Sequence, residues 1–321
     1  MPELPEVETV ARGLRAHLPG RTIVSVQLGT KTDFIDDPAA LESMLPGSRF
    51  AEVRRHGKLM ALRLERAAAN SAQESFFLLI HLGMTGHVLV CAPGQPVEPH
   101  THVFLSLDDG REVRYTDARR FGRIRVEREH KMPAILGKLG LEPLEMTEQQ
   151  FTSRLAGRGT MIKALLLNQG VFRGLGNIYT DESLYRARIH PTRNASRLRD
   201  HERRALYRAI RKILEEAIRL GGSSISDYVD SEGKPGTFQV RHRAYGREGK
   251  ACSRCGTKIR RVIVAGRSSY FCPRCQAAPR RRKNAVQKQK SRGSSRRARK
   301  RVRIANAASQ RRPLRRKGHR A

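Results

Sequence analysis

The sequence predicts an α+β protein of several domains: a β-rich N-terminal domain, a helical domain, a four-cysteine zinc module and a basic tail. Four observations lead to this prediction. Short segments of alternating apolar and polar residues fill the first part of the chain, whereas apolar residues recur at helical spacing over residues 147–220. Four of the five cysteines fall in one cluster, and almost no large apolar side chain follows them.

The opening segment MPELPEVETV begins an apolar pattern with three- and four-residue steps, which predicts a helix that runs to about Leu18. Early prolines and glutamates suit the N-terminus of a helix. A small second residue such as Pro2 also permits removal of Met1, which would expose a secondary amine that can act as a nucleophile. Taken alone, the opening segment fits two interpretations: the N-terminus of an ordinary helix, or a reactive amino terminus.

Eight short alternating segments follow the first helix and are separated by Gly, Pro, Asp and Asn. They predict a β domain of sandwich or barrel type over residues 1–131. The segments are TIVSVQL, RFAEVRR, LMALRL, FFLLIHL, HVLVCA, HVFLSL, EVRYTD and GRIRVE. Residues 132–146 are punctuated by Gly and Pro and separate this domain from the helical one as a linker.

Glycines at 170, 174 and 176 interrupt the helical region and precede a new helix near Asn177. Two helices joined by glycine turns form a common DNA-docking unit, in which backbone amides at the new N-terminus and Asn177 could hold a phosphate. An ordinary helical hairpin fits the same spacing. Residues 221–250 are rich in Gly, Ser and charge, which predicts a mobile loop.

The cysteine cluster has the spacing of a zinc site. Cys252 and Cys255 form one pair, Cys272 and Cys275 form the other, and 16 residues separate the pairs. Four thiolates complete the coordination sphere of a tetrahedral ion and leave no open position for a substrate. We therefore expect one structural Zn²⁺. KIRRVIV and SSYF predict a hairpin between the pairs with Arg267 at its tip, where a merely solvated arginine is the alternative.

The charge of the chain points to a polyanion as partner. Of the 64 Lys and Arg residues, 19 fall in residues 276–321, which hold no Asp or Glu, so 45 basic residues face 30 acidic ones in the rest. Nucleic acid fits better than a membrane because no basic amphipathic helix with a broad apolar face stands out. No stretch approaches a membrane span and no secretory signal is present, so we expect a cytoplasmic protein.

Seven segments together resemble the formamidopyrimidine-DNA glycosylases in order and spacing. They are PELPEVETV, HGK at 56–58, HLGMTG at 81–86, DARRFG at 117–122, GLGNIYTDESL at 174–184, GGSSISDYVDSEGKPG at 221–236 and the four-cysteine finger. The resemblance covers about residues 1–277. It implies a two-layer β-sandwich with helices (1–131), a linker (132–146), a helix-two-turn-helix domain (147–250) with a lesion-recognition loop (221–238), and a zinc finger (251–277).

The resemblance also implies an activity. The family excises oxidised purines, notably 8-oxoguanine and formamidopyrimidines, and then cleaves the strand by β- and δ-elimination. The matching opening segment carries the nucleophile onto Pro2 and the general acid/base onto Glu3. By the same resemblance, Lys58 reaches the damaged base or its flanking phosphate and assists both steps, and Arg267 is a further catalytic residue. Glu6 lines the same pocket or caps the helix, and the sequence leaves both roles open.

By the same resemblance, the partner is damaged double-stranded DNA, bound by a monomer that is associated with the nucleoid. His81, Lys163, Asn177 and Arg267 match positions that grip phosphates around the lesion. Met84, Arg119 and Phe121 match a trio that fills the gap left by the extruded base. Without the resemblance, Met84 and Phe121 would be assigned to the core.

Residues 278–321 depart from the family pattern, and for this basic tail we expect disorder and non-specific DNA affinity. The nearest alternative is an endonuclease VIII-like enzyme for oxidised pyrimidines, which shares the proline amine and the finger. A non-catalytic zinc-ribbon protein would also explain the charge and the cysteines. The loop at 221–236 and the Met84, Arg119, Phe121 set favour the purine enzyme, and Pro2, Glu3 and Lys58 disfavour a pure binding protein.

Overall fold

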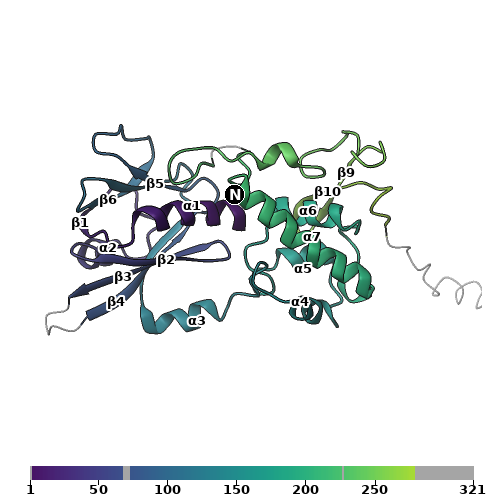
Figure 1. Ribbon diagram of the computed structural model, residues 1–321, viewed down its shortest axis with the longest axis horizontal. Coiled ribbons are helices and arrows are strands. Elements are labelled where there is room, and N and C mark those ends of the chain that lie inside the picture. Colours follow the sequence, from purple (N-terminus) through teal and green to yellow (C-terminus); the bar gives the residue numbers. More distant parts are fainter. Residues whose placement is uncertain (1, 68–72, 226–227, 279–321) are drawn as a thin grey trace, which may run out of the picture. The chain divides into compact units, whose positions relative to one another are not determined.

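The computed structural model describes residues 2–67, 73–225 and 228–278. The tail expected over residues 278–321 lies outside the described residues, apart from Ala278. The first 279 residues form one compact unit. Figure 1 shows the two four-stranded sheets of this unit on one side, and most of its helices together with a two-stranded sheet on the other.

The first helix, α1, spans Leu4–His17. The Glu6 side chain accepts from the N–H of the N-cap residue Glu3 at 2.8 Å, and Pro5 lies in the first turn. One apolar face of α1 is fully buried, including Val7, Val10 and Leu14. The predicted helix is therefore confirmed.

Two four-stranded antiparallel sheets follow, with strand orders β1-β6-β7-β5 and β2-β3-β4-β8. The strands are β1 Ile23–Leu28, β2 Arg49–His56, β3 Leu59–Ala67, β4 Gln73–His81, β5 His87–Cys91, β6 Thr101–Leu107, β7 Glu112–Thr116 and β8 Arg123–Arg128. A short helix, α2 (Pro38–Met44), lies between β1 and β2 in the chain. Side chains from α1 and both sheets share one core, which confirms the β-sandwich.

The helical part contains the elements that the period change predicted. They are α4 Glu148–Leu155, α5 Ile162–Leu167, α6 Asn177–Arg186 and α7 Asp200–Arg219, with 3₁₀ turns at η2 Ala195–Arg197 and η3 Phe238–Arg241. The 3₁₀ turn η1, Glu129–Lys131, ends the segment predicted as the sandwich, and the segment predicted as a linker begins with its own short helix, α3 Met132–Leu136. Leu4 of α1 belongs to the helical core rather than to the sandwich core, so the chain start reaches into the helical part.

The cysteine module contains one antiparallel hairpin, β9 Arg260–Val264 and β10 Arg267–Phe271. Ala265 and Gly266 form its turn with positive φ angles of 50° and 72°. Arg267 is the first residue after this turn, and its side chain is exposed. Among the described residues, no helix is long and apolar enough to cross a membrane.

Candidate active site and DNA interface

The start of α1 is anchored to the loop that precedes α6. The Leu4 N–H donates to the Gly174 carbonyl at 3.0 Å, and the Leu4 side chain is fully buried. Pro2 is buried beside this contact and lines a cavity of about 100 Å³. The chain start is thus presented to a small cavity at the meeting point of the sandwich and helical parts.

The Glu3 carboxylate lies on the N-terminus of α6. It accepts from the backbone N–H groups of Gly176 at 2.9 Å, Ile178 at 2.8 Å and Tyr179 at 3.3 Å. Gly176 is needed for this approach, because a Cβ there would lie 2.7 Å from Glu3 Cγ. Three of the backbone amides near the start of α6 therefore donate to the protein's own carboxylate instead of being free for a DNA phosphate.

Burial raises the pKa of Glu3, and the Lys58 ammonium and the three amides oppose that rise. A carboxyl group with a raised pKa retains a proton to donate, which is what a general acid requires. The Oδ1 atom of Asn177, the first residue of α6, is buried and has no hydrogen-bond partner among the described residues. This amide oxygen can accept from a donor but cannot donate to a phosphate oxygen, so the phosphate contact of Asn177 stays a prediction.

Glu6 takes both roles that the sequence left open. It accepts from the Glu3 N–H at 2.8 Å as a cap, and from the Ser223 N–H at 2.7 Å and the Tyr179 hydroxyl in the cavity wall. Burial and the neighbouring Glu3 charge raise the pKa of Glu6 to about 7. A second proton-binding carboxyl group therefore lies within the same site.

Lys58 lies in the turn between β2 and β3, and it is buried. Its exposed fraction is 9%, and burial lowers its pKa while Glu3 and Glu6 oppose the shift. The preceding Gly57 has φ +63°, and a Cβ there would lie 2.8 Å from Arg173 Cβ and 2.9 Å from the Gly174 N atom. The turn is therefore pressed against the same loop that anchors α1.

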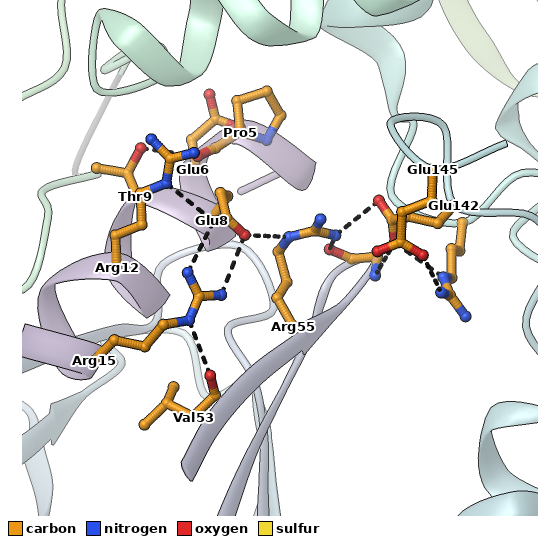
Figure 2. A network of polar contacts seen from close by, with 12 residues as sticks. Pro5, Glu6, Glu8, Thr9, Arg12, Arg15, Val53, Arg55, Glu142 and Glu145 are labelled. Atoms are coloured by element: carbon orange, nitrogen blue, oxygen red, sulfur yellow. Dashed lines mark hydrogen bonds and ion pairs between the residues drawn. The ribbon is translucent and has the colours of Figure 1, made fainter. Parts of the chain in front are cut away.

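A buried carboxylate holds this turn in place. Glu142, in the segment predicted as a linker, accepts from the Gly57 N–H at 3.1 Å, Arg55 Nη1 at 3.0 Å and Arg173 Nε at 2.9 Å. Arg55 also pairs with Glu8 of α1 at 2.7 Å (Figure 2). The sequence reasoning missed Glu142, because an acid between a leucine and a proline in a linker carries no local pattern.

His81 and Arg267 lie close to Lys58. His81 is paired in the sheet with Leu59, the residue after Lys58, and its Nδ1 accepts from the Gly83 N–H at 3.1 Å. Burial and the Lys58 charge lower the pKa of His81, so its ring is neutral at pH 7. The Arg267 charge is near enough to lower the pKa of Lys58. Sandwich and finger thus contribute cationic or hydrogen-bonding groups to one site.

Lys163 differs from its predicted role as a phosphate contact. Its side chain is fully buried, and its ammonium donates to Asp181 Oδ1 at 2.7 Å and to the Ser268 carbonyl at 2.8 Å. Asp181 also accepts from the Tyr270 N–H at 2.9 Å. Through these two hydrogen bonds, the buried Lys163 fastens the hairpin that carries Arg267 to α5 and α6.

Met84, Arg119 and Phe121 lie on two adjoining loops and point outward. Met84 is 39% and Phe121 is 53% exposed, and the Arg119 guanidinium lies 4.6 Å from the centre of the Phe121 ring. The fully buried Asp117 accepts from Thr85 Oγ1, the Tyr115 hydroxyl and the Gly122 N–H, so one carboxylate ties both loops together. Exposed apolar side chains on such fixed loops suit insertion into a base stack.

The four cysteines converge as their spacing predicts. Their Sγ atoms all lie within 4.8 Å of one another, and two of the separations are 3.5 Å and 3.9 Å. Ligands at about 2.3 Å around one tetrahedral zinc ion lie roughly 3.8 Å apart. Cys252, Cys255, Cys272 and Cys275 therefore fit one structural Zn²⁺.

Comparison with known proteins assigns the sandwich, the helical part and the finger to one family. Residues 1–124 match the formamidopyrimidine-DNA glycosylase N-terminal domain, residues 139–229 match the formamidopyrimidine-DNA glycosylase H2TH domain, and residues 249–278 match the zinc finger found in FPG and IleRS. The three matches follow one another along the chain in the order sandwich, helices and finger.

Relatives and solved structures agree with these matches. The chain is 46% identical to a formamidopyrimidine-DNA glycosylase of Solibacter usitatus over 86% of its own length and 99% of that protein. It is 44% identical to one of Symbiobacterium thermophilum over 87% and 90%. The fold is similar to that of a Lactococcus lactis FPG mutant in complex with Fapy-dG containing DNA, with TM-score 0.77, 35% identity and coverage of 86% and 100%.

A second Lactococcus lactis structure, a complex with abasic site containing DNA, gives TM-score 0.77 and 34% identity over 86% of this chain and 100% of that one. Sequence relatives, solved structures and family matches thus cover the same sandwich, helical and finger regions. The chain belongs to the formamidopyrimidine-DNA glycosylase family.

Proposed function

We propose that this protein removes oxidised purines, namely 8-oxoguanine and formamidopyrimidines, from duplex DNA and then cleaves the abasic strand. The observation that carries the proposal is the buried Glu3 carboxylate, which is held by three α6 amides directly beside Pro2. Relatives that share this fold have been solved with Fapy-dG DNA and with abasic DNA. Damaged duplex DNA is therefore the expected partner of a monomer that works in the nucleoid.

Pro2 is the nucleophile once Met1 has been removed. Its secondary amine attacks the sugar C1′ and displaces the base, which takes up the amine proton. The C1′–O4′ bond of the sugar then breaks, and the resulting iminium has no N–H proton to lose. The iminium therefore stays cationic and acts as an electron sink. Loss of a C2′ proton then breaks the bond to the 3′ phosphate, and a second elimination breaks the bond to the 5′ phosphate.

Glu3 protonates the opening sugar oxygen in the first stage, because its pKa is raised and its position is fixed. Lys58 supplies a charge within reach of the same atoms, and Arg267 approaches from the finger. We assign phosphate contacts to His81, Asn177 and Arg267. The outward loops place Met84, Arg119 and Phe121 in the vacated stack.

We also propose that the parts work as a sandwich domain (1–131), a connecting segment (132–146), a helix-two-turn-helix domain (147–250) with its loop at 221–238, and a finger (251–277). The ion pair between Lys163 and Asp181 fastens the finger hairpin to the helices. Glu142 ties the connecting segment to the Lys58 turn. The functional groups therefore come from every part.

One assay separates this function from its alternatives. Duplexes carrying 8-oxoguanine opposite cytosine, thymine glycol, or no lesion are incubated with the protein, and strand scission is measured. We expect scission of the 8-oxoguanine strand. Preference for thymine glycol would support the endonuclease VIII-like alternative, and binding without any scission would support the non-catalytic one.

Glu142→Gln should slow strand scission of an abasic duplex by roughly 10- to 100-fold, the scale expected when a catalytic group is displaced by about 1 Å. The substitution leaves the Arg55 and Arg173 guanidinium groups without their shared buried carboxylate, so the Gly57–Lys58 turn loses its anchor. Single-turnover rates at saturating enzyme measure the effect.

Glu145→Gln is the matched control for this prediction. The Glu145 side chain is 74% exposed and lies 3.8 Å from Arg173, so the wild-type rate should be retained. A Glu142→Gln protein as fast as the wild type would show that the turn holds Lys58 in place without the carboxylate.

Zinc removal should abolish lesion binding while leaving the sandwich folded. A site of four thiolates contributes roughly 10 kcal/mol or more of folding free energy when it binds its ion. The finger positions Arg267, so its unfolding removes that group from the site. Fluorescence anisotropy with a lesion duplex, before and after chelation, measures the loss.

Cys91→Ala is the control for zinc removal, because Cys91 is buried in the sandwich and lies outside the four-cysteine cluster. It should keep both zinc and DNA affinity. Full affinity in a metal-free Cys252→Ser, Cys272→Ser protein would overturn the prediction.

A further inference from the structure

The loop between α7 and η3 is closed at its base and carries a compact turn at its tip. The Thr237 N–H donates to the Leu220 carbonyl at 2.8 Å, and the Phe238 N–H donates to the Gly222 carbonyl at 2.9 Å. Within the tip, residues 230–234, the Asp230 N–H donates to the Lys234 carbonyl at 2.9 Å. Asp230 Oδ1 also accepts the Glu232 and Lys234 N–H groups, both at 2.9 Å.

This tip docks on the sandwich, far along the chain from the helices that carry the loop. The Val90 N–H of β5 donates to the Ser231 carbonyl at 3.0 Å, and Ser231 is 1% exposed. Its side chain lies over Gly13 of α1: a Cβ on Gly13 would stand 3.0 Å from Ser231 Cβ and closer still to Oγ. Ser231 thus fills the space that a side chain at position 13 would need.

Glycine in the interior of a helix is ordinarily destabilising relative to alanine, so α1 carries an unfavourable residue at this point. The packing of Ser231 explains why glycine occurs there, because the serine side chain fills the space that a side chain at position 13 would need. The other side-chain contact of the tip is weak, because Glu232 lies 3.6 Å from His17 and is half exposed. The packing of Ser231 over Gly13 and the hydrogen bond from Val90 to Ser231 therefore provide most of the contact between the tip and the sandwich.

The same loop forms one wall of the cavity beside Pro2. Ser223, Ile225 and Tyr228 line it together with Pro2 and Met84. The Ser223 N–H donates to Glu6, and the Tyr228 hydroxyl donates to the Glu6 carbonyl at 3.2 Å. Tyr228 precedes the tip by two residues, so the docked tip sets how far this wall can retreat from Pro2.

We infer that Gly13 and Ser231 form a latch that holds the loop against an extruded base and so determines base excision. The inference rests on the proposed function. The latch residues are separate from Pro2, Glu3 and Lys58, and an abasic sugar has no base for the loop to hold. Excision of 8-oxoguanine therefore depends on the latch, whereas scission of a pre-formed abasic site does not.

The test is Gly13→Ala, which adds the clashing Cβ and displaces Ser231. Single-turnover excision from an 8-oxoguanine duplex should fall by about 10-fold or more, while abasic scission should change by no more than about 2-fold. Rescue should follow in Gly13→Ala, Ser231→Gly, because removing the serine side chain makes room for the new methyl group. Glu232→Gln, in the same turn but exposed, is the control and should behave as the wild type.

The outcomes are distinct. Unchanged excision in Gly13→Ala, or equal losses of excision and abasic scission with no rescue in the double variant, would overturn the latch. A wild-type protein that cleaves abasic DNA but releases no 8-oxoguanine would overturn the proposed function instead. Selective loss with rescue supports the latch.

Discussion

Glu3→Gln should bind a lesion duplex yet excise 8-oxoguanine roughly 10²- to 10⁴-fold more slowly than the wild type, the usual range for a lost general acid or base. The amide cannot donate a carboxylic proton to the opening sugar oxygen. The variant also places an NH₂ group against N–H donors, since both Glu3 oxygens accept backbone amides. A loss of stability of about 1–3 kcal/mol is expected from that mismatch.

The pH dependence supplies a second readout for Glu3. Its pKa is raised by burial, so the protonated fraction falls as pH rises through that value, and wild-type excision should slow on the alkaline side. Glu3→Gln should lose this limb of the profile. A thermal melt identifies variants that are merely unfolded, and near-normal excision by a folded Glu3→Gln protein would remove Glu3 from the mechanism.

Blocking the Pro2 amine should abolish covalent trapping altogether. Borohydride reduces an iminium to a stable protein–DNA adduct, and peptide mapping should place that adduct on Pro2 in the processed wild-type protein. Retained Met1 or an N-terminal tag converts the amine to an amide, which lacks the nucleophilic lone pair. The expected result is no adduct with an 8-oxoguanine duplex, although the protein still binds it.

Pro2→Gly is the matched variant, because it keeps a primary amine at the same place and should retain part of the trapping. Glu3 would still lie on the α6 amides, since its contacts do not involve the Pro2 ring. Efficient adduct formation by a protein whose terminus is shown to be blocked would contradict the assignment. Lys58, buried beside Glu3, would then be the next candidate.

Local patterns in the sequence were enough for the eight strands of the sandwich, the first and last long helices and the zinc site. Alternating residues predicted the eight strands, and helical spacing predicted α1 and α7, because both periods reflect which face of an element is buried. The two close cysteine pairs predicted four converging thiolates, since each pair forms its half of the site within a few residues. Resemblance in seven short segments supplied the family.

Tertiary structure alone decided how the site is assembled. Glu3 and Tyr179 are separated by 176 positions in the chain, and no local pattern shows that a carboxylate rather than a phosphate occupies the α6 amides. Lys163 was expected at the DNA and lies buried against Asp181, because a lysine gives the same sequence signal in both settings. The roles of Glu142 and of the Gly13–Ser231 contact likewise depend on which distant segments pack together. A single sequence records side-chain periodicity but not those pairings.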